Sequence, residues 1–269
     1  MTPTQVPERF LNVLTEQERV FSREVSVTVQ NSIPPSKDIP LENQTHWIRI
    51  PSVICVFVDM RGSTGLSAQT KDRTTAAAYQ LFTGTATKLL VAFDAAHIDI
   101  KGDGVFALFD GSQPHRALAA AVTFRTFCSE SIVPKIRDKT GVNIGNHIGI
   151  DSKGVLVRRI GLRRRIDGND RENEVWAGKP VNMAARLASE AGDSEILVSS
   201  RFHALLTRSH AVLSCGCSGG RPGGARSELW TERAVSASLG CDFDVIKVLG
   251  STWCGVHGAE YCEALLEGE

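Results

Sequence analysis

The fold is decided by residues 53–59, whose sequence is VICVFVD. This run of apolar, mostly β-branched residues shows no polar alternation, which predicts a central strand covered on both faces. The strand ends abruptly at Asp59, and the glycine-containing turn RGSTG follows at residues 61–65. The pattern predicts a carboxylate held at the end of a buried strand, next to a turn.

A second segment, residues 98–109 with the sequence IDIKGDGVFALF, contains two short apolar strands around a glycine-bounded turn. We expect a hairpin with Asp103 near its tip. Helical patterns at residues 73–93 and 114–130 and a strand at 143–150 complete the order β, α, β, β, α, β. This order predicts an α+β, ferredoxin-like fold in which helices pack on one face of an antiparallel sheet.

The rest of the chain is expected to extend this domain. A short amphipathic helical stretch at residues 10–14 belongs to an N-terminal arm, and the charged segment 158–173 predicts a solvated loop or exposed hairpin. Glycine dominates residues 214–226, which marks a loop and a boundary. The predicted parts are an N-terminal arm at residues 1–50, the main domain at 51–213 and a small, cysteine-containing C-terminal extension at 214–269.

Composition limits the partners of the chain. Thirty basic residues balance thirty acidic ones, so no global field attracts nucleic acid or an anionic membrane. The sequence also lacks a run of about 18 apolar residues. Its N-terminus lacks the basic and apolar regions of a signal peptide. We therefore expect a cytoplasmic protein with no nucleic-acid or membrane partner.

Three motifs together resemble the catalytic domain of class III adenylate and guanylate cyclases. They are FVDMRGSTGLS at residues 57–67, KGDGVFALF at 101–109 and WAGKPVNMAARL at 176–187. In that family they form a metal-binding strand end, a Gly-Asp hairpin and a helix that carries an Asn and an Arg. The resemblance spans residues 52–206, and it implies the ferredoxin-like βαββαβ cyclase domain and nucleotide cyclase activity.

The chemistry of cyclisation suits the two aspartates. The ribose 3′-hydroxyl must lose its proton and attack the α-phosphate while pyrophosphate leaves, and two divalent ions stabilise the resulting charge. Carboxylates are preferred ligands of Mg²⁺ and Mn²⁺. We therefore predict two such ions per active site, held by Asp59 and Asp103 with the Met60 carbonyl as a further ligand; the alternative is two ordinary turn aspartates. The turn predicted to bind the triphosphate through its backbone N–H groups consists of Arg61, Gly62, Ser63, Thr64 and Gly65.

Asn182 and Arg186 are four residues apart, so both project from one face of their predicted helix. In the resembling family such a pair comes from the partner subunit, where the Asn orients the ribose and the Arg stabilises charge on the α-phosphate. The resemblance therefore implies a homodimer with shared active sites. An ordinary surface ion pair is the alternative for Arg186.

Two positions that recognise the base in purine cyclases differ here. Adenylate cyclases usually carry Lys at the position of Asp99 and Asp or Thr at the position of Val175. Asp99 can accept a hydrogen bond from uracil, cytosine or guanine, whereas Val175 offers nothing to a purine O6. The chain thus resembles the bacterial pyrimidine cyclases of the Pycsar antiphage systems, which implies a pyrimidine triphosphate as substrate and a separate effector for the cyclic product. We expect UTP ahead of CTP, because uracil presents a proton at N3 to an ionised Asp99 whereas cytosine N3 is unprotonated. A guanylate or mixed-specificity cyclase and an inactive nucleotide sensor are the alternatives.

Cysteines are unevenly distributed. Two of the seven, Cys55 and Cys128, lie in apolar runs and are expected to be buried free thiols. The other five fall between Cys215 and Cys262, and in a reducing compartment such clustering favours a metal site over disulfides.

The C-terminal cysteines predict a candidate structural zinc site at Cys254, His257 and Cys262, with a fourth ligand from Cys215, Cys217 or Cys241. The alternative is a short helix that packs through Trp253, Tyr261 and Leu265, with its cysteines simply buried.

Overall fold

A computed structural model describes residues 6–162, 171–193, 195–218, 220–236 and 239–269. The chain divides into two compact units. The first comprises Met1–Pro51 and Val155–Ala177, and the second comprises Ser52–Gly154 and Gly178–Glu269. Two long strands belong partly to each unit.

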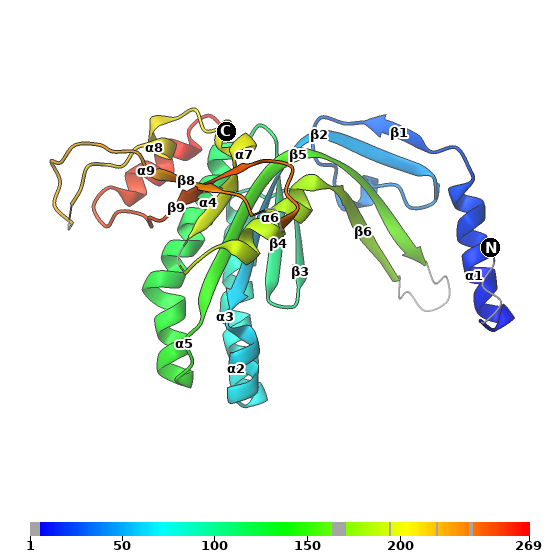
Figure 1. The fold of residues 1–269 in the computed structure, drawn as a ribbon, viewed down its shortest axis with the longest axis horizontal. Coiled ribbons are helices and arrows are strands. Elements are labelled where there is room, and N and C mark those ends of the chain that lie inside the picture. Colours follow the sequence, from blue (N-terminus) through cyan, green and yellow to red (C-terminus); the bar gives the residue numbers. More distant parts are fainter. Residues whose placement is uncertain (1–5, 163–170, 194, 219, 237–238) are drawn as a thin grey trace. The chain divides into compact units, whose positions relative to one another are not determined.

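The second unit is built on a mixed sheet (Figure 1). The strand order is β3 (His97–Lys101), β4 (Gly104–Asp110), β2 (His46–Arg61), β5 (Gly145–Leu162), β7 (Ile196–Ser199), β9 (Val245–Leu249) and β8 (Trp230–Ala234). The predicted hairpin is confirmed, because β3 and β4 pair antiparallel with Lys101 opposite Gly104. Strand β4 also pairs antiparallel with β2, where Val58 lies opposite Val105. The apolar strand at residues 53–58 is therefore central, as predicted.

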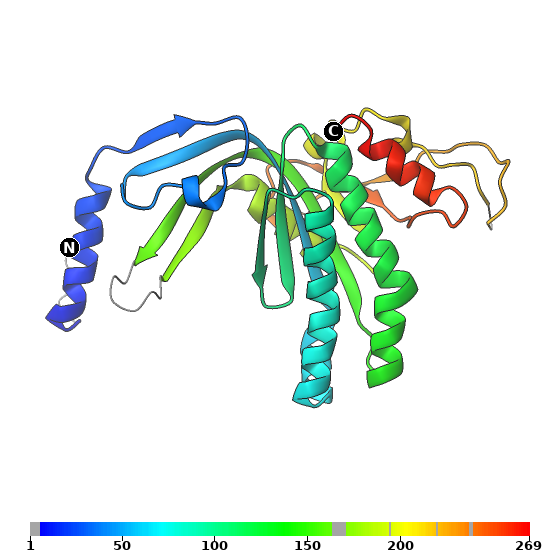
Figure 2. The same ribbon diagram turned by 180° about the vertical axis from the view of Figure 1, so that it is seen from behind.

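The predicted helices cover one face of this sheet (Figure 2). They are α3 (Asp72–Ala92) and α4 (Pro114–Phe127), and α4 continues through a π turn (Cys128–Ile132) into α5 (Val133–Thr140). The Phe82 and Phe124 rings meet edge to face with centroids 5.1 Å apart, and both side chains are fully buried. Ile54 and Val56 from β2 complete the same core. Burial of these apolar side chains supplies the main stabilisation of the unit.

A further helix, α6 (Lys179–Glu190), packs on the opposite face (Figure 1). Leu187 joins Leu197 of β7 and Val248 of β9 in a separate buried cluster. The approach is so close that a Cβ at Gly149 of β5 would lie 2.0 Å from the Ala184 carbonyl oxygen. Only glycine fits at this contact.

The sheet differs from the sequence prediction in two respects. Helix α6 covers the face that was expected to be bare, and β5 and β7 pair parallel rather than antiparallel. Both differences have one cause, because α6 lies in the connection between β5 and β7 and parallel neighbours require such a crossover. The uninterrupted apolar character of residues 53–58 agrees with a sheet covered on both faces.

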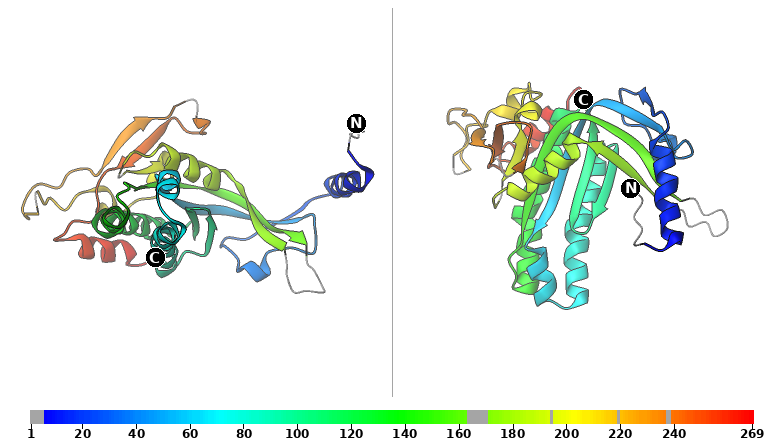
Figure 3. Two further views of the ribbon diagram at one scale, coloured as in Figure 1. Left: turned by 90° about the horizontal axis from the view of Figure 1, so that it is seen from below. Right: turned by 45° about the vertical axis from the view of Figure 1, so that its right-hand side comes forward.

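Residues after 213 contribute to the same sheet and core. Strand β9 pairs antiparallel with both β7 and β8. Helix α9 (Gly258–Leu266) follows and packs beside α4, with Leu265 fully buried (Figure 3). The glycine-rich loop predicted at 214–226 contains only isolated bridges among its described residues.

The short elements of the second unit are α2 (Ser63–Gln69), α7 (Ser200–His203) and α8 (Ser209–Val212). Ser199 caps α7, because its Oγ accepts a hydrogen bond from the Phe202 N–H at 3.2 Å.

The first unit contains the predicted N-terminal helical stretch as α1 (Glu8–Phe21). It also contains β1 (Ser26–Val29), which pairs parallel with the start of β2, a 3₁₀ turn η1 (Ser36–Asp38), and β6 (Arg171–Gly178), which pairs with β5. The Arg159 N–H donates to the Pro40 carbonyl at 2.9 Å, which ties the charged segment to the arm. Part of the predicted loop or hairpin at 158–173 is therefore strand, and its residues 163–170 lie outside the described residues.

Across the described ranges, no helix is both long enough and apolar enough to cross a membrane.

Candidate active site

The two predicted metal-binding aspartates lie at the same end of paired strands. The β2–β4 ladder reaches Val58 and Val105, so Asp59 is the next residue of β2, and Asp103 lies in the turn directly before β4 begins at Gly104. Asp59 Oδ1 lies close to Gly104, the residue after Asp103, because a Cβ placed at Gly104 would be 3.4 Å from that oxygen. Both aspartates are partly exposed. The hairpin thus brings Asp103 beside Asp59 at an accessible end of the central strands.

The electrostatics of this pair suit a cation. Burial, and then the negative charge of Asp103, raise the pKa of Asp59 to about 6, while a hydrogen bond from the Met60 N–H acts in the opposite direction. Two carboxylates that repel each other are stabilised by a divalent ion between them, and oxygen ligands suit Mg²⁺ or Mn²⁺. The donor set therefore fits the ions that the cyclase motifs imply.

Met60 has a buried side chain, 2% exposed, and so it anchors β2 in the core. The role of its carbonyl as a metal ligand stays a prediction.

The predicted triphosphate turn joins β2 to α2. Gly62 adopts a left-handed conformation with φ +81°, and a Cβ there would lie 3.1 Å from the Asn143 carbonyl oxygen. Glycine is therefore required at this position for both conformation and space. Ser63, Thr64 and Gly65 form the first turn of α2, whose N–H groups have no helical partner because every helix leaves its first N–H groups unpaired. Arg61 forms an ion pair with Asp193.

Helix α6 carries Asn182 and Arg186, and both side chains are exposed. The buried side of the helix is formed by Met183, Ala184 and Leu187, which face the sheet. The exposed pair therefore projects away from the core of its own unit, as a residue that serves a partner subunit must.

A loop distant in the sequence holds Arg186. Its Nη1 donates to the carbonyl oxygens of Leu239 at 2.6 Å and Gly240 at 2.5 Å. These residues lie between β8 and β9, more than fifty positions further along the chain. No local pattern could have signalled this contact.

Asp242 anchors the same loop through three cations. Its carboxylate accepts hydrogen bonds from Lys153 at 2.9 Å, Lys179 at 2.8 Å and Arg201 at 2.8 Å. Arg201 also pairs with Asp151, which is fully buried. Since Lys179 begins α6, the network joins the start of that helix to the loop that contacts Arg186.

The two predicted base-recognition residues belong to different units. Asp99 is on β3, where its carboxylate accepts hydrogen bonds from the Ile100 N–H at 2.8 Å and pairs with Lys101 at 2.9 Å. Val175 is partly buried on β6 of the first unit. Their roles in base selection stay predictions.

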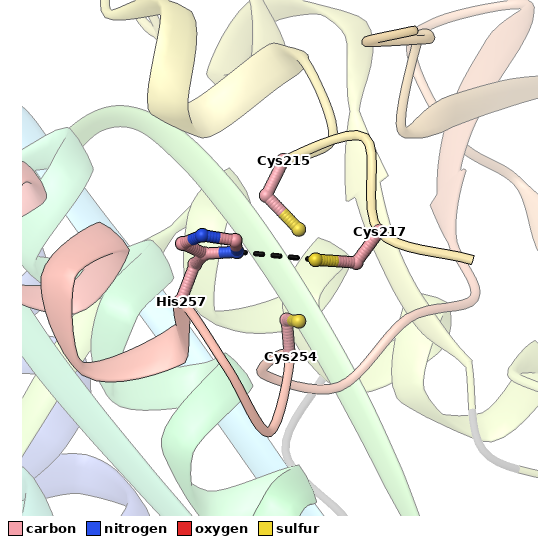
Figure 4. A group of neighbouring side chains, drawn as sticks. All are labelled: Cys215, Cys217, Cys254 and His257. Carbon is pink, nitrogen blue, oxygen red and sulfur yellow. Dashed lines mark hydrogen bonds between the residues drawn. The ribbon is translucent and has the colours of Figure 1, made fainter. Parts of the chain in front are cut away.

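A second group of functional side chains lies near the C-terminus. Cys215, Cys217, Cys254 and His257 place their ligand atoms within 4.8 Å of one another (Figure 4). Cys254 and His257 lie in one group, as predicted. Cys215 and Cys217 both belong to this group, whereas only one of them was expected as a fourth ligand. Cys262 is outside this group because it lies one turn into α9, where its thiol contacts Thr123. The helix of the alternative interpretation is also present as α9.

Comparisons with known proteins show which family and fold this chain resembles. The family model described as the adenylate and guanylate cyclase catalytic domain matches residues 46–218. A uridylate cyclase from Propioniciclava tarda is 35% identical over 239 residues, which cover 87% of this chain and 75% of that protein. A uridylate cyclase from Micromonospora echinofusca is 33% identical, covering 83% of this chain and 72% of that protein.

Among solved structures, the adenylyl cyclase CyaB from P. aeruginosa superimposes with a TM-score of 0.60. The match has 19% sequence identity and covers 77% of this chain and 98% of that one. It supports the fold alone. The matched domain contains Asp59, Asp103, Asn182 and Arg186.

The chain belongs to the adenylate and guanylate cyclase catalytic domain family, the class III nucleotide cyclases. It is a nucleotide cyclase with the α+β fold of that class.

Proposed function

We propose that this chain is a uridylate cyclase, which converts UTP to 3′,5′-cyclic UMP and pyrophosphate. The observation that carries the proposal is the pair of neighbouring carboxylates, Asp59 and Asp103, at the accessible end of β2 and in the adjoining β3–β4 turn. The two uridylate cyclases that align with most of this chain support the choice of UTP.

The proposed residue roles are those that the cyclase motifs imply, and the positions of the side chains support them. Asp59 and Asp103 would hold two Mg²⁺ or Mn²⁺ ions, with the Met60 carbonyl as a further ligand. When bound, these ions neutralise charge on the entering and leaving oxygens. The turn from Arg61 to Gly65 would bind the triphosphate, and the unpaired N–H groups at the start of α2 support this role, because helix N-termini bind anions.

Cyclisation exchanges one phosphorus–oxygen bond for another. The ribose 3′-oxygen bonds to the α-phosphorus, the bond from that phosphorus to the pyrophosphate oxygen breaks, and the 3′-hydroxyl proton is released. Arg186 would stabilise the charge that develops on the α-phosphate, and Asn182 would orient the ribose. Arg186 Nη1 is engaged by the two loop carbonyls, and a guanidinium has further N–H donors that can reach a phosphate oxygen.

A homodimer with shared active sites supplies the partner for these residues. Asn182 and Arg186 are exposed on α6, away from the buried side of the helix, which supports their action on a second subunit. A head-to-tail pair would create two equivalent sites, each with aspartates from one chain and Arg186 from the other.

Base choice rests on Asp99 and Val175. An ionised Asp99 accepts a hydrogen bond, and uracil N3–H can donate one, whereas cytosine presents an unprotonated N3 beside its amino group. The Asp99 carboxylate pairs with Lys101 at 2.9 Å. We therefore place UTP ahead of CTP. A guanylate or mixed-specificity cyclase remains the second candidate, since guanine also offers N–H donors to Asp99.

The cyclic product would serve as a signal in defence against phage, detected by a separate effector. This part of the proposal rests on the resemblance to Pycsar cyclases. An inactive nucleotide sensor is disfavoured because the chain keeps both metal carboxylates and Arg186.

The test is conversion of UTP by the purified full chain with Mg²⁺ or Mn²⁺, with products identified by mass. We expect cyclic UMP and equimolar pyrophosphate, and no product after the divalent ions are chelated. Unchanged turnover with a chelator present would contradict the metal assignment. Absence of cyclic nucleotide from any of the four common nucleoside triphosphates would support the sensor.

A further inference from the structure

A cluster of three thiols and one imidazole, outside the cyclase motifs, has the composition and geometry of a zinc site. Cys215 and Cys217 come from the loop after α8, and Cys254 and His257 come from the turn before α9 (Figure 4). We propose that these four side chains bind one structural Zn²⁺ ion, which fastens the C-terminal segment to the rest of the second unit.

Distances between the ligand atoms suit a tetrahedral ion. All four ligand atoms lie within 4.8 Å of one another, and Cys217 Sγ is 3.1 Å from His257 Nδ1. Zinc binds Cys sulfur at about 2.3 Å and His nitrogen at about 2.0 Å, so tetrahedral ligands are separated by roughly 3.5–3.8 Å. Small rotations of the side chains are therefore enough to close the site. Figure 4 shows the four side chains converging on one point from two segments of the chain.

The ligand types select the metal. Thiolate and imidazole are soft or intermediate ligands that favour zinc, whereas the Mg²⁺ expected at Asp59 and Asp103 requires oxygen. Four protein ligands fill a tetrahedral shell, which is typical of a structural site because no position is left for substrate. Disulfides explain the cluster less well, since three thiols leave one unpaired and give His257 no part.

Surrounding hydrogen bonds hold the Cys254–His257 turn in position to bind a metal. The Val256 N–H donates to Cys254 Sγ at 3.4 Å, a contact that orients a ligating sulfur. The Gly258 N–H donates to the Cys254 carbonyl at 2.7 Å and closes the turn. The preceding Trp253 donates its Nε1–H to Thr123 of α4 at 2.8 Å. One half of the site is therefore fixed to α4.

The other half of the site lies in a loop that has little core of its own. Residues 221–228 are exposed, and only the Gly216 position within 214–218 is buried. A cavity of about 460 Å³ lies beside the cluster, lined by Cys215, Cys217 and Cys254 together with Leu118 and Tyr261. Apolar packing is incomplete at this place, so a metal cross-link supplies stability that side-chain burial does not.

Metal analysis of the full chain, purified without chelator, tests the proposal directly. We expect about one zinc per chain, the number that one closed four-ligand site binds. Replacement by Co²⁺ should produce thiolate-to-cobalt charge transfer and the visible bands of tetrahedral cobalt. A chain without zinc that takes up none when Zn²⁺ is added would overturn the proposal. A mass lower by two hydrogens, from a disulfide within the cluster, would also overturn it.

Single variants locate the ligands. Cys215→Ser, Cys217→Ser, Cys254→Ser and His257→Ala should each lose most of the zinc, whereas the matched controls Cys241→Ser and Cys262→Ser should keep it. Equal zinc in all six variants would refute the assignment. If a ligand variant does not fold, thiol modification of the wild-type chain decides instead. The amount of zinc released should be proportional to the number of thiols that are modified. Mass mapping should find Cys215, Cys217 and Cys254 protected from modification until the zinc leaves.

Discussion

The aspartate pair and the cysteine–histidine cluster gather ligands in opposite ways. Asp59 and Asp103 extend adjacent strands of a buried sheet, where the register of the ladder holds them together despite mutual repulsion. Cys215, Cys217, Cys254 and His257 instead come from two loops separated along the chain, with a cavity beside them. The fold alone positions the two carboxylates of the first group. Their repulsion is therefore present before a cation binds and is relieved when it binds. The second group needs a metal to become rigid.

The two regions should therefore respond oppositely to mutation. Loss of a ligand at the aspartate pair should abolish chemistry and leave stability intact. Loss of a ligand at the cysteine–histidine cluster should lower stability and leave the chemistry of the folded protein intact.

The largest effect is expected for Asp59→Asn and Asp103→Asn. Each should lower kcat at least about a thousandfold, because several kcal/mol of charge stabilisation in the transition state are lost. Thermal unfolding of the metal-free variants should not occur at a lower temperature, since each substitution removes repulsion. Asp138→Asn, which changes an exposed carboxylate on α5, is the control and should keep full activity. Wild-type turnover in either site variant would remove the metal-binding role.

Subunit mixing should give the next largest effect. Inactive Asp103→Ala and inactive Arg186→Ala chains, combined and allowed to exchange, should recover about a quarter of wild-type activity, because half of the dimers would contain one complete site out of two. Activity is measured against subunit ratio, with exchange verified by a tag on one chain. No recovery after complete exchange would show that Arg186 does not act across subunits.

Cys254→Ser should lower stability and leave kcat nearly unchanged, the opposite of the aspartate variants. A loss of about 3 kcal/mol of metal-dependent stability lowers the Tm by roughly 6–12 °C for a domain of this size. Below the transition, kcat with UTP should stay within about twofold of wild type, since none of the four ligands belongs to the cyclase motifs. Cys262→Ser provides the comparison, because Cys262 contacts Thr123 outside the cluster. A stability loss that Cys262→Ser matches would indicate packing rather than metal binding.

Asp242→Asn should produce the smallest change, a fall in kcat of about tenfold with little change in KM. The substitution loosens the loop whose carbonyls hold Arg186, and it leaves the substrate contacts in place. Asp244→Asn, two residues away, is the matched control. A higher KM with unchanged kcat would show that the loop binds substrate instead of positioning Arg186.

The Asp242 carboxylate should also make the stability of the protein depend on pH. Partial burial acts to raise the pKa of Asp242, but hydrogen bonds from Lys179, Lys153 and Arg201 outweigh it and hold the pKa well below its ordinary range. A depressed pKa contributes stability that is present above the unfolded value of about 3.9 and is lost as the pH falls below it. The wild-type Tm should therefore fall more steeply than that of Asp242→Asn below about pH 4. Parallel curves would contradict this role.

The comparison also explains which features the sequence could predict. Asp59, Asp103 and the Asn182–Arg186 pair lie on short, contiguous patterns whose strand or helix period determines where each side chain points. Other contacts depend on how distant segments pack, which no local period encodes. Examples are the pairing of Cys217 with His257 and that of Arg186 with Leu239 and Gly240. Cys262 shows the limit most clearly. It is five positions from His257, yet α9 begins between them and carries Cys262 toward Thr123.

The central claim is the reaction itself, and competition among nucleotides tests it most directly. The full chain is given equimolar UTP, CTP, GTP and ATP with Mn²⁺, and the cyclic products are separated by mass. We predict cyclic UMP in at least about tenfold excess over the purine products, equivalent to about 1.4 kcal/mol of discrimination. Predominant cyclic CMP would change only the choice between pyrimidines, and predominant cyclic GMP or cyclic AMP would contradict the account.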